Sequence, residues 1–265
     1  MLKNIRTINM ELEFPFISCK CVTYGRVDLL EESIESFIKQ EYPTERCELI
    51  IVNDYPKQNL IYNEASNITI VNLDETFELL GDKEQYATEL CQGNIICQWD
   101  DDDIALPNHL QNVSKHFTDK INILHWENGI YYNEPDITNI EWLGNSGIVF
   151  RKTAWEAIGG HPRENAGYDM TFIERLFAYN PEGRLFALPP REEASWIYRW
   201  SMPSAYLYHQ SGLGHDVEGR PNIIQRHSTH IEELRKQGKI PTGDICLKPH
   251  WNKDYVQLLA DYINK

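Results

Sequence analysis

The stretch GNIICQWDDDDIALP (93–107) places four consecutive aspartates directly after a short apolar run. The run at 94–99 has the length and composition of a strand buried on both faces, as in a parallel sheet. Adjacent carboxylates repel one another, and a divalent cation, which prefers hard oxygen ligands, offsets that repulsion. The alternative is a solvated acidic turn; an EF-hand is excluded because the loop lacks the required glycine and distal glutamate. We therefore expect Asp100–Asp103 to form a cation site where a buried strand ends.

Strand and helix patterns alternate on the N-terminal side of this stretch. The alternation predicts an α/β fold with a mixed, mainly parallel sheet flanked by helices. Ligands bind beyond the carboxyl ends of the strands in such sheets, so the polar clusters at 23–26, 53–54 and 100–103 are expected to meet at one rim. The expected strands are 16–22, 48–54, 68–73 and 94–99, and the expected helices are 28–40 and 82–92.

The part of the chain after this stretch is less regular. Residues 201–222 are rich in Gly, Pro, Ser and His, which predicts a long functional loop that we expect to act as a lid. The simplest division is one domain over 1–220, with halves at about 16–106 and 107–220, followed by a helical extension over 221–265. Helices are expected at 107–117, 169–180, 223–237 and 251–265, and strands at 121–126, 129–132, 145–151 and 195–200.

Three of the expected helices have an apolar face that should contact the sheet. In the helix at 28–40, the acidic side chains Glu31, Glu32 and Glu35 fall off that face. The expected inward residues are Leu30, Ile34, Phe37 and Ile38 in the first helix, Leu110, Val113 and Phe117 in 107–117, and Met170, Ile173, Leu176 and Phe177 in 169–180.

The composition narrows the classes of function. The chain has 40 acidic and 25 basic residues and a net charge of -15, which makes nucleic acid an unlikely partner through bulk electrostatics. No apolar run approaches the ~20 residues that span a bilayer, and the N-terminal segment has no apolar stretch of signal-peptide type. The six cysteines form no C-x-x-C pair and are expected to be free thiols. We expect a cytoplasmic protein, either free or peripheral at the membrane.

The motifs of several other enzyme classes are absent from the sequence. It has no Walker P-loop, no G-x-S-x-G elbow, no H-E-x-x-H and no G-x-G-x-x-G after a strand.

Four further candidate residues have two interpretations each. Asp54 either holds a nucleoside or caps a turn, and Asp169 is either a catalytic base or a helix N-cap. His209 and His215 are either metal ligands or ordinary loop residues.

In combination, these motifs resemble the family 2 glycosyltransferases with the GT-A fold. Val-Thr-Tyr-Gly-Arg (22–26) is similar to that family's Pro-Thr-Tyr-Asn-Arg opening. IIVND (50–54) resembles its "iivvDD" strand, and GNIICQWDDDDIALPNHL (93–110) resembles its "Ge.i.flDdDD...p..l" segment. The resemblance covers roughly residues 16–177 with the motifs in the right order.

The last of these motifs contains the candidate catalytic base, Asp169. Tyr168-Asp169 followed by Arg175 stands where the family has Glu-Asp followed by Arg. The acidic run and the candidate base are both retained. The departures from the family pattern are Val22 for Pro, Gly25 for Asn, Asn53 for Asp and Tyr168 for Glu.

The resemblance implies a metal-dependent, inverting transfer of a sugar from a nucleoside-diphosphate sugar, with UDP favoured, to a glycan, lipid-linked or other hydroxyl acceptor. Mn²⁺ or Mg²⁺ stabilises the leaving diphosphate as a Lewis acid, and a carboxylate deprotonates the acceptor. The implied roles are donor binding by Val22, Tyr24, Arg26, Asp54, Lys83, Asp100 and Asp101; metal binding by Asp102 and Asp100, with His209 favoured over His215 as a further ligand; and base catalysis by Asp169.

Two other functions stay open at this point. A sugar-nucleotide pyrophosphorylase uses a related fold, but it needs a Gly-rich, Arg- or Lys-bearing loop after the first strand, where 23–27 has one Gly and one Arg. A degenerate transferase that serves as a nucleotide-sugar-binding module would be indicated by the loss of Asp102 or Asp169, and both are present.

Overall fold

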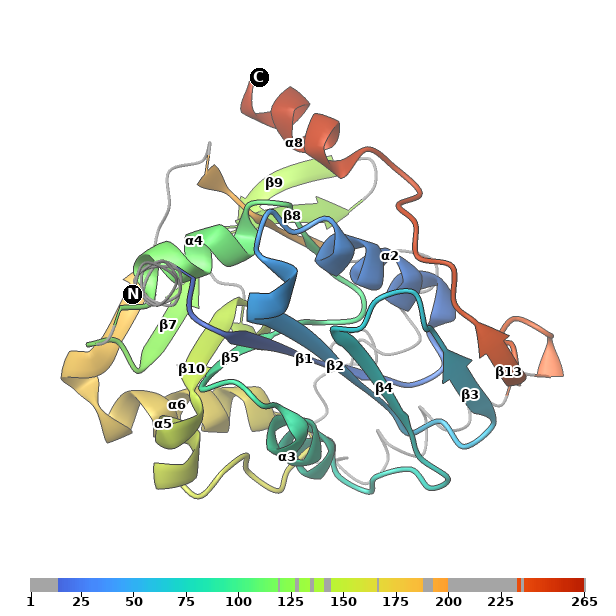
Figure 1. Cartoon of the computed structure of the whole chain (residues 1–265), viewed down its shortest axis with the longest axis horizontal. Coiled ribbons are helices and arrows are strands. Elements are labelled where there is room, and N and C mark those ends of the chain that lie inside the picture. The colour runs from blue at the N-terminus through green and yellow to red at the C-terminus, as the bar shows by residue number, and fades with distance from the viewer. Residues whose placement is uncertain are drawn as a thin grey trace, which may run out of the picture.

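The computed structural model describes residues 14–118, 120–126, 129–133, 136–140, 144–165, 167–187, 193–199, 233–234 and 236–264. Its central sheet contains β1 (Ile17–Thr23), β2 (Cys47–Asn53), β4 (Ile68–Asn72), β5 (Ile95–Gln98), β7 (Ile123–Trp126), β10 (Ile148–Arg151) and β11 (Arg184–Ala187). The strand order is β11-β7-β10-β5-β1-β2-β4 (Figure 1). Strand β1 is parallel to β2 and β5, and β10 is antiparallel to β5 and β7. The predicted mainly parallel α/β sheet is confirmed.

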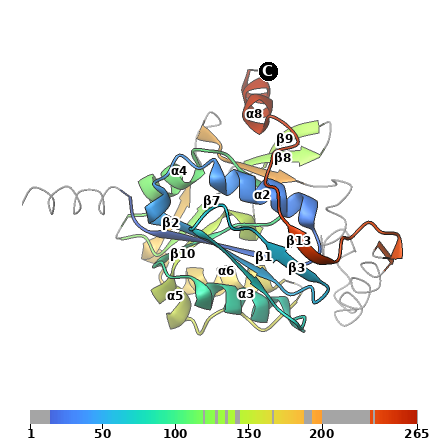
Figure 2. The same cartoon turned by 45° about the vertical axis from the view of Figure 1, so that its right-hand side comes forward.

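Helices cover both faces of this sheet. They are α2 (Val27–Ile38), α3 (Leu80–Leu90), α4 (His109–His116), α5 (Lys152–Ala157) and α6 (Tyr168–Tyr179). Figure 1 shows α2 and α4 on one face and α3, α5 and α6 on the other, and Figure 2 shows the same layers after a 45° turn about the vertical axis. None of the helices in the described part of the chain is long and apolar enough to cross a membrane.

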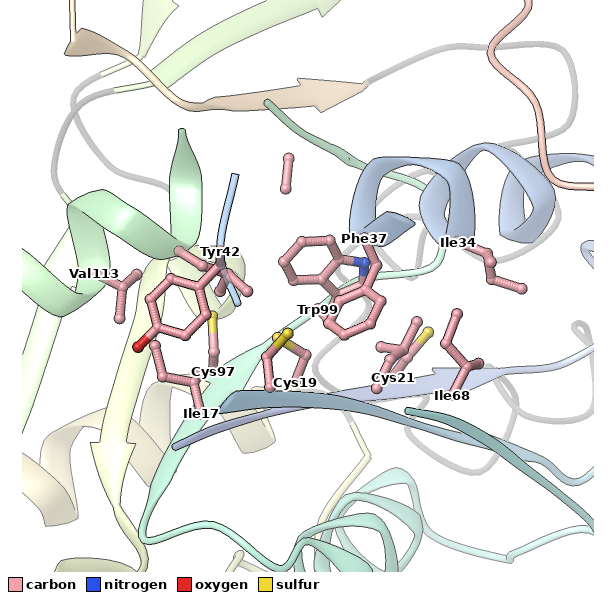
Figure 3. Close-up of a cluster of buried hydrophobic side chains, with 14 of the residues drawn as sticks. Ile17, Cys19, Cys21, Ile34, Phe37, Tyr42, Ile68, Cys97, Trp99 and Val113 are labelled. Carbon is pink, nitrogen blue, oxygen red and sulfur yellow. The ribbon is translucent and has the colours of Figure 1, made fainter. Parts of the chain in front are cut away.

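The main core lies between the sheet and α2. Alternate residues of β1, namely Ile17, Cys19 and Cys21, are fully buried on this face (Figure 3). Trp99 lies between them and Phe37 of α2, with the two rings edge to face at 5.7 Å between centroids. Because side chains alternate along a strand, the residues between them, including Lys20, face α3.

The predicted inward residues are correct for the first two helices except at Ile38. Ile38 was predicted to face inward but is 44% exposed at the end of α2. Glu32 lies off the apolar face as predicted, yet it is only 2% exposed because it pairs with Arg199 on the other side of α2. In α6 the prediction was wrong for Met170, which is 44% exposed, and it omitted Phe172, which is fully buried. The apolar stripe of α6 therefore begins one turn before Phe172, at Tyr168, and Met170 falls outside it.

A second sheet covers the far side of α2. It contains β6 (Ile104–Ala105), β8 (Gly129–Asn133), β9 (Asp136–Ile140) and β12 (Trp196–Arg199), in the order β6-β12-β8-β9. The predicted C-terminal helix is α8 (Tyr255–Ile263), and its Tyr255 and Leu259 pack with Ile104, Ile130 and Ile197 of this sheet. This packing joins the C-terminal segment to the core.

Some elements differ from the sequence predictions. The strand expected at 145–151 begins only at Ile148, because a 3-10 turn occupies Gly144–Gly147. The extension predicted to be helical also contains β13 (Gly243–Cys246), which pairs in parallel with β3 (Gln58–Ile61). Strands β3, β6, β9, β11 and β13 were not predicted, since each is two to five residues long and has no clear apolar alternation. The loop at 201–222 and the boundary at 220 lie outside the described residues.

Candidate active site

The loops that follow β1, β2 and β5 meet at one rim of the central sheet. Strands β1 and β2 end side by side, with Thr23 in register with Asn53, and β5 lies on the other side of β1. Side chains from the three loops contact one another: Arg26 binds Asp101, and Asp54 binds a lysine that also reaches Thr23. The predicted convergence of 23–26, 53–54 and 100–103 is confirmed.

Arg26 joins the first loop to the acidic run. Its Nε donates to Asp101 Oδ2 at 3.1 Å, its Nη2 donates to Asp101 Oδ1, and its Nη1 donates to Asp102 Oδ2 at 2.7 Å. None of these three residues is more than 9% exposed. Burial raises the pKa of Asp101 to about 6, although the Arg26 charge acts in the opposite direction. Both Asp101 oxygens are engaged by Arg26, so Asp101 holds this arginine at the rim.

Asp100 has a different set of partners. It is partly buried and accepts hydrogen bonds from Gln98 Nε2 at 2.7 Å and from Ser146 Oγ. Its backbone carbonyl accepts from Ser33 Oγ of α2 at 2.9 Å. Burial, followed by repulsion from Asp102, raises the pKa of Asp100 to about 7. The Asp100 carboxylate is thus held in place beside another carboxylate that repels it.

Asp103 links the acidic run to the second sheet. It is 2% exposed and accepts hydrogen bonds from Trp196 Nε1 at 3.0 Å and from the backbone N–H of Arg199 at 2.9 Å. Burial raises the pKa of Asp103 well above its ordinary value. The Arg199 side chain, from the same strand, donates to the backbone carbonyl of Asp102. Asp103 and Arg199 therefore attach the turn to strand β12 of the second sheet.

A buried ion pair lies on the β2 side of the rim. Lys83 Nζ of α3 contacts Asp54 Oδ1 at 2.5 Å and donates to the backbone carbonyl of Thr23 at 2.7 Å. The other oxygen of Asp54 accepts from the backbone N–H of Phe77 at 3.0 Å. Lys83 Nζ also lies 5.9 Å from the ring centroid of Tyr24. Asp54 therefore does more than cap a turn, because it joins three separate segments at the rim.

Two further candidate residues for donor binding, Val22 and Tyr24, are less buried than Asp54 and Lys83. Val22 is partly buried and pairs with Val52 of β2. Tyr24 is also partly buried, and its ring meets Tyr55 edge to face at 4.9 Å. Leu234 and Ile240, from the C-terminal segment, pack against the same two tyrosines. An aromatic side chain at this rim can stack on a planar base, which keeps Tyr24 a candidate for that role.

Asp169 lies in the first turn of α6 and is partly buried. The N-cap of this helix is Gly167, with φ of 75°, and no side chain makes a capping hydrogen bond. The N-cap interpretation of Asp169 was therefore wrong. Within the described residues, its carboxylate makes no hydrogen bond or ion pair. It is thus available to a ligand.

The donor set fits a divalent cation at Asp100 and Asp102. Both supply hard oxygen ligands, and their mutual repulsion is the energetic cost that a cation relieves. Among the described residues, no three His, Cys, Asp or Glu side chains are grouped to hold a metal ion. The remaining ligands would have to come from water and from the diphosphate of a substrate. His209 and His215 lie outside the described residues.

Several residues that hold the acidic run in place were not predicted from the sequence. Gln98 and Ser146 orient Asp100, and Arg199 and Trp196 orient the turn that follows it. The apolar run at 94–99 already contained one hint, because Gln98 is a polar residue inside a buried strand. Ser146 carried no comparable pattern in the sequence.

Comparison with protein-family models decides the family. The model described as "Glycosyl transferase family 2" matches residues 20–174, which is more than half of the chain. The chain belongs to this family. The match includes the loops after β1, β2 and β5 and the first turn of α6. No curated protein matches the sequence.

Solved structures share the fold of this family 2 protein at low sequence identity. S. aureus TarS 1-349 in complex with UDP-GlcNAc has a TM-score of 0.58 and 13% identity, covering 94% of this chain and 72% of TarS 1-349. The mannosyltransferase PcManGT from Pyrobaculum calidifontis, in complex with GDP-Man and Mn2+, has a TM-score of 0.51 and 11% identity, covering 94% of this chain and 80% of PcManGT. Other TarS comparisons span only 60% and 38% of the TarS chain. The predicted GT-A architecture is confirmed.

Proposed function

We propose that this protein transfers a sugar from a nucleoside-diphosphate sugar, with UDP as the favoured carrier, to a hydroxyl acceptor, with inversion and with the help of a divalent cation. The observation that carries the proposal is the meeting of Arg26, Lys83 and the acidic run at one rim of the sheet. Positive side chains and a cation-binding pair at the carboxyl ends of parallel strands suit a diphosphate. Membership of the family supports the same conclusion.

The donor half of the site would bind and polarise the diphosphate. Asp100 and Asp102 would hold Mn²⁺ or Mg²⁺, which as a Lewis acid stabilises the negative charge of the leaving diphosphate. Arg26 holds Asp102 in place through Nη1 and Asp101 through two further contacts. Tyr24 and Asp54 border the nucleoside, and Lys83 adds a positive charge beside them.

The acceptor half would supply the general base. Asp169 accepts a proton from the acceptor hydroxyl as that oxygen attacks the sugar carbon. A single displacement of this kind inverts the configuration of that carbon. Helix α6, whose first turn contains Asp169, packs against β7 and β10, which lie on the other side of β5 from the strand β2 that Asp54 follows. The acceptor classes that remain are a glycan, a lipid-linked saccharide or another hydroxyl compound.

Two observations guide the choice of conditions. TarS was solved with UDP-GlcNAc and PcManGT with GDP-Man and Mn2+, so both donors belong in the first test. All six cysteines are free thiols, which supports a reducing compartment such as the cytoplasm. Association with a membrane surface would be tested with a lipid-linked acceptor.

The first experiment measures binding and turnover together. Melting temperature is recorded with UDP-GlcNAc and with GDP-Man, each with and without Mn²⁺, and release of nucleoside diphosphate is then followed with a panel of acceptors. A cation-dependent rise in melting temperature with turnover supports the proposal, since a ligand at a hundredfold excess over Kd stabilises by ~2.7 kcal/mol. Binding without turnover would indicate a degenerate module. Pyrophosphate release from a nucleoside triphosphate and a sugar phosphate would indicate a pyrophosphorylase.

Two substitutions test the assigned roles. Asp102→Asn should abolish the cation-dependent part of donor binding, and undiminished activity in excess EDTA would contradict it. Asp169→Asn should preserve melting temperature and donor binding while lowering transfer by ~10²–10⁴. Transfer above about a tenth of the wild-type rate would place the base elsewhere, given the ~10²–10⁴ loss expected. Asp261→Asn, at an exposed position of α8, is the matched control and should change neither quantity.

A further inference from the structure

A buried charged cluster lies on the face of the central sheet that α3 and α6 cover, and it includes Tyr168, which directly precedes Asp169 in the chain. Lys20 of β1 forms an ion pair with Glu84 of α3, and the Tyr168 hydroxyl donates to the other Glu84 oxygen, Oε1, at 2.9 Å. The exposed fractions of Lys20, Glu84 and Tyr168 are 0%, 1% and 6%. A buried carboxylate costs free energy unless it is paired and hydrogen-bonded. Strand β1, α3 and α6 thus share one buried network, in which both carboxylate oxygens of Glu84 have a partner.

The start of α6 has no side-chain cap, so its first turn is held by contacts with other segments. Gly167 occupies the N-cap position with φ of 75°, and no side chain caps the helix. The preceding segment contains two more glycines with positive φ, Gly159 and Gly160. Glycine adopts these conformations at no steric cost but leaves the backbone freer. The connection before α6 is bonded to α3, because the Glu164 carbonyl accepts from the Gly81 N–H at 3.0 Å and Asn165 Oδ1 accepts from the Leu80 N–H at 2.8 Å. The Tyr168 hydroxyl extends this attachment to α3 into the first turn of α6.

The anchor acts on the turn that contains the candidate base. Tyr168 is the first residue of α6 and is followed directly by Asp169. A shift or rotation of this turn would move the Asp169 carboxylate, which makes no hydrogen bond of its own within the described residues. Misplacement of a catalytic group by ~1 Å lowers a rate by as much as ~10²-fold.

We propose that Tyr168 is a positioning residue, whose hydroxyl bond to Glu84 fixes the first turn of α6 and thereby places the Asp169 carboxylate for proton transfer. This inference rests on the proposed function. Lys20 contributes by neutralising Glu84, so that the carboxylate is retained in the core as an acceptor for Tyr168. Within the described residues, the Lys20 and Glu84 side chains make no hydrogen bond to the rim residues of the donor site, although the Glu84 charge is one of the causes that raise the pKa of Asp100.

The primary test is Tyr168→Phe, which keeps the ring and removes the hydroxyl. We expect kcat to fall by ~10–10²-fold, the range for a misplaced group, with the Kd of the donor unchanged. The matched control is Tyr42→Phe: Tyr42 is also 6% exposed, and its hydroxyl donates to the Pro15 carbonyl at 2.5 Å on the opposite face of the sheet. Both variants should lose similar stability, but only Tyr168→Phe should lose kcat. Equal kcat in the two variants would overturn the proposal.

A pair of double variants separates the hydrogen bond from the buried charge. Lys20→Met/Glu84→Gln removes both charges but keeps an acceptor oxygen for Tyr168, and it should keep kcat within about threefold of wild type. Lys20→Met/Glu84→Leu removes the acceptor and should match Tyr168→Phe. Adding Tyr168→Phe to the leucine variant should cause no further loss, because the effects of partners in one interaction are not additive. A full additional loss would overturn the proposal.

Hydrogen exchange provides a readout that does not depend on activity. In Tyr168→Phe the amide of Thr171 should exchange faster than in wild type, while amides of β1 and α2 should not change. If the wild-type protein transfers no sugar from any donor, the proposed function fails, and this measurement alone decides the anchoring. Unchanged exchange at Thr171 would then show that Tyr168 does not hold the turn.

Discussion

Arg199 should be one of the most costly single residues to replace in this protein. Its side chain is fully buried in β12. The guanidinium donates to the Asp102 carbonyl, to a Glu32 carboxylate oxygen and, at 3.2 Å, to the Tyr255 hydroxyl. It therefore connects the acidic run, α2 and α8. Arg199→Met keeps much of the side-chain volume and removes all of these hydrogen bonds.

The expected loss of unfolding free energy depends on which hydrogen bonds Glu32 keeps in the Arg199→Met variant. Removing one partner of a buried ion pair costs ~3–5 kcal/mol, because the remaining charge is left uncompensated. Glu32 would still accept from the Tyr255 hydroxyl and from the Asn252 N–H, each at 2.9 Å. Because these two neutral donors still bind Glu32, we expect the loss of unfolding free energy to lie at the lower end of that range, at about 3 kcal/mol. For a protein of this size class that corresponds to a fall in melting temperature of about 6–12 °C.

The free energy of unfolding would be measured by urea denaturation followed by circular dichroism. Arg199→Met/Glu32→Gln removes both charges and should recover most of the loss, since neutral replacement of a buried pair is often tolerated. Lys115→Met is the surface control, because Lys115 pairs with Glu193 at 3.6 Å and both side chains are exposed; it should cost about 0.5 kcal/mol or less. A loss below about 1 kcal/mol in Arg199→Met, the range of an exposed pair, would refute this reasoning.

Three further predictions concern separate parts of the core. Asn53→Asp should cost about 1–3 kcal/mol in urea denaturation, because the Asn53 Nδ2 donates to Asn72 Oδ1 at 3.0 Å and a carboxylate cannot. Burial lowers the pKa of His161 well below its ordinary 6.5, so the unfolded state binds the extra proton. Stability should then fall by up to about 1.4 kcal/mol per pH unit on acidification below 6.5, with a shallower slope in His161→Gln. Gly81→Ala should cost about 1–3 kcal/mol by thermal denaturation, since a Cβ there would lie 1.8 Å from the Pro162 carbonyl oxygen.

The strands and their polar ends were predictable because the evidence for them is local. A strand covered on both faces must be apolar along its length, as at 94–99. The polar residues that end it, such as Asp100, must then lie at the edge of the sheet. Since parallel strands end at the same edge, the convergence of three loops followed without knowledge of any contact.

The orientation of individual helix residues was predicted less well. An apolar stripe leaves the rotation of a helix open by about one residue. In α6 that rotation depends on the burial of Tyr168 and Phe172, and Met170 was assigned to the wrong side. Glu32 was placed off the apolar face of its helix, and its burial was not predicted, because a carboxylate is rarely buried without a partner. Its partner is Arg199, which lies 167 residues later in the chain.

The sequence by itself determined the α/β class, the rim at which three polar loops meet, and the candidate residues for a site, including Asp100, Asp102 and Asp169. Only the tertiary structure decided how they are used: Asp101 holds Arg26, Asp102 stays beside Asp100, and Asp169 is not a helix cap. The reason is physical. Burial and backbone conformation depend mainly on neighbouring residues, and so they leave a periodic pattern in the sequence. The partner of a carboxylate depends on which distant segments the fold brings within hydrogen-bonding distance, and such contacts leave no local pattern.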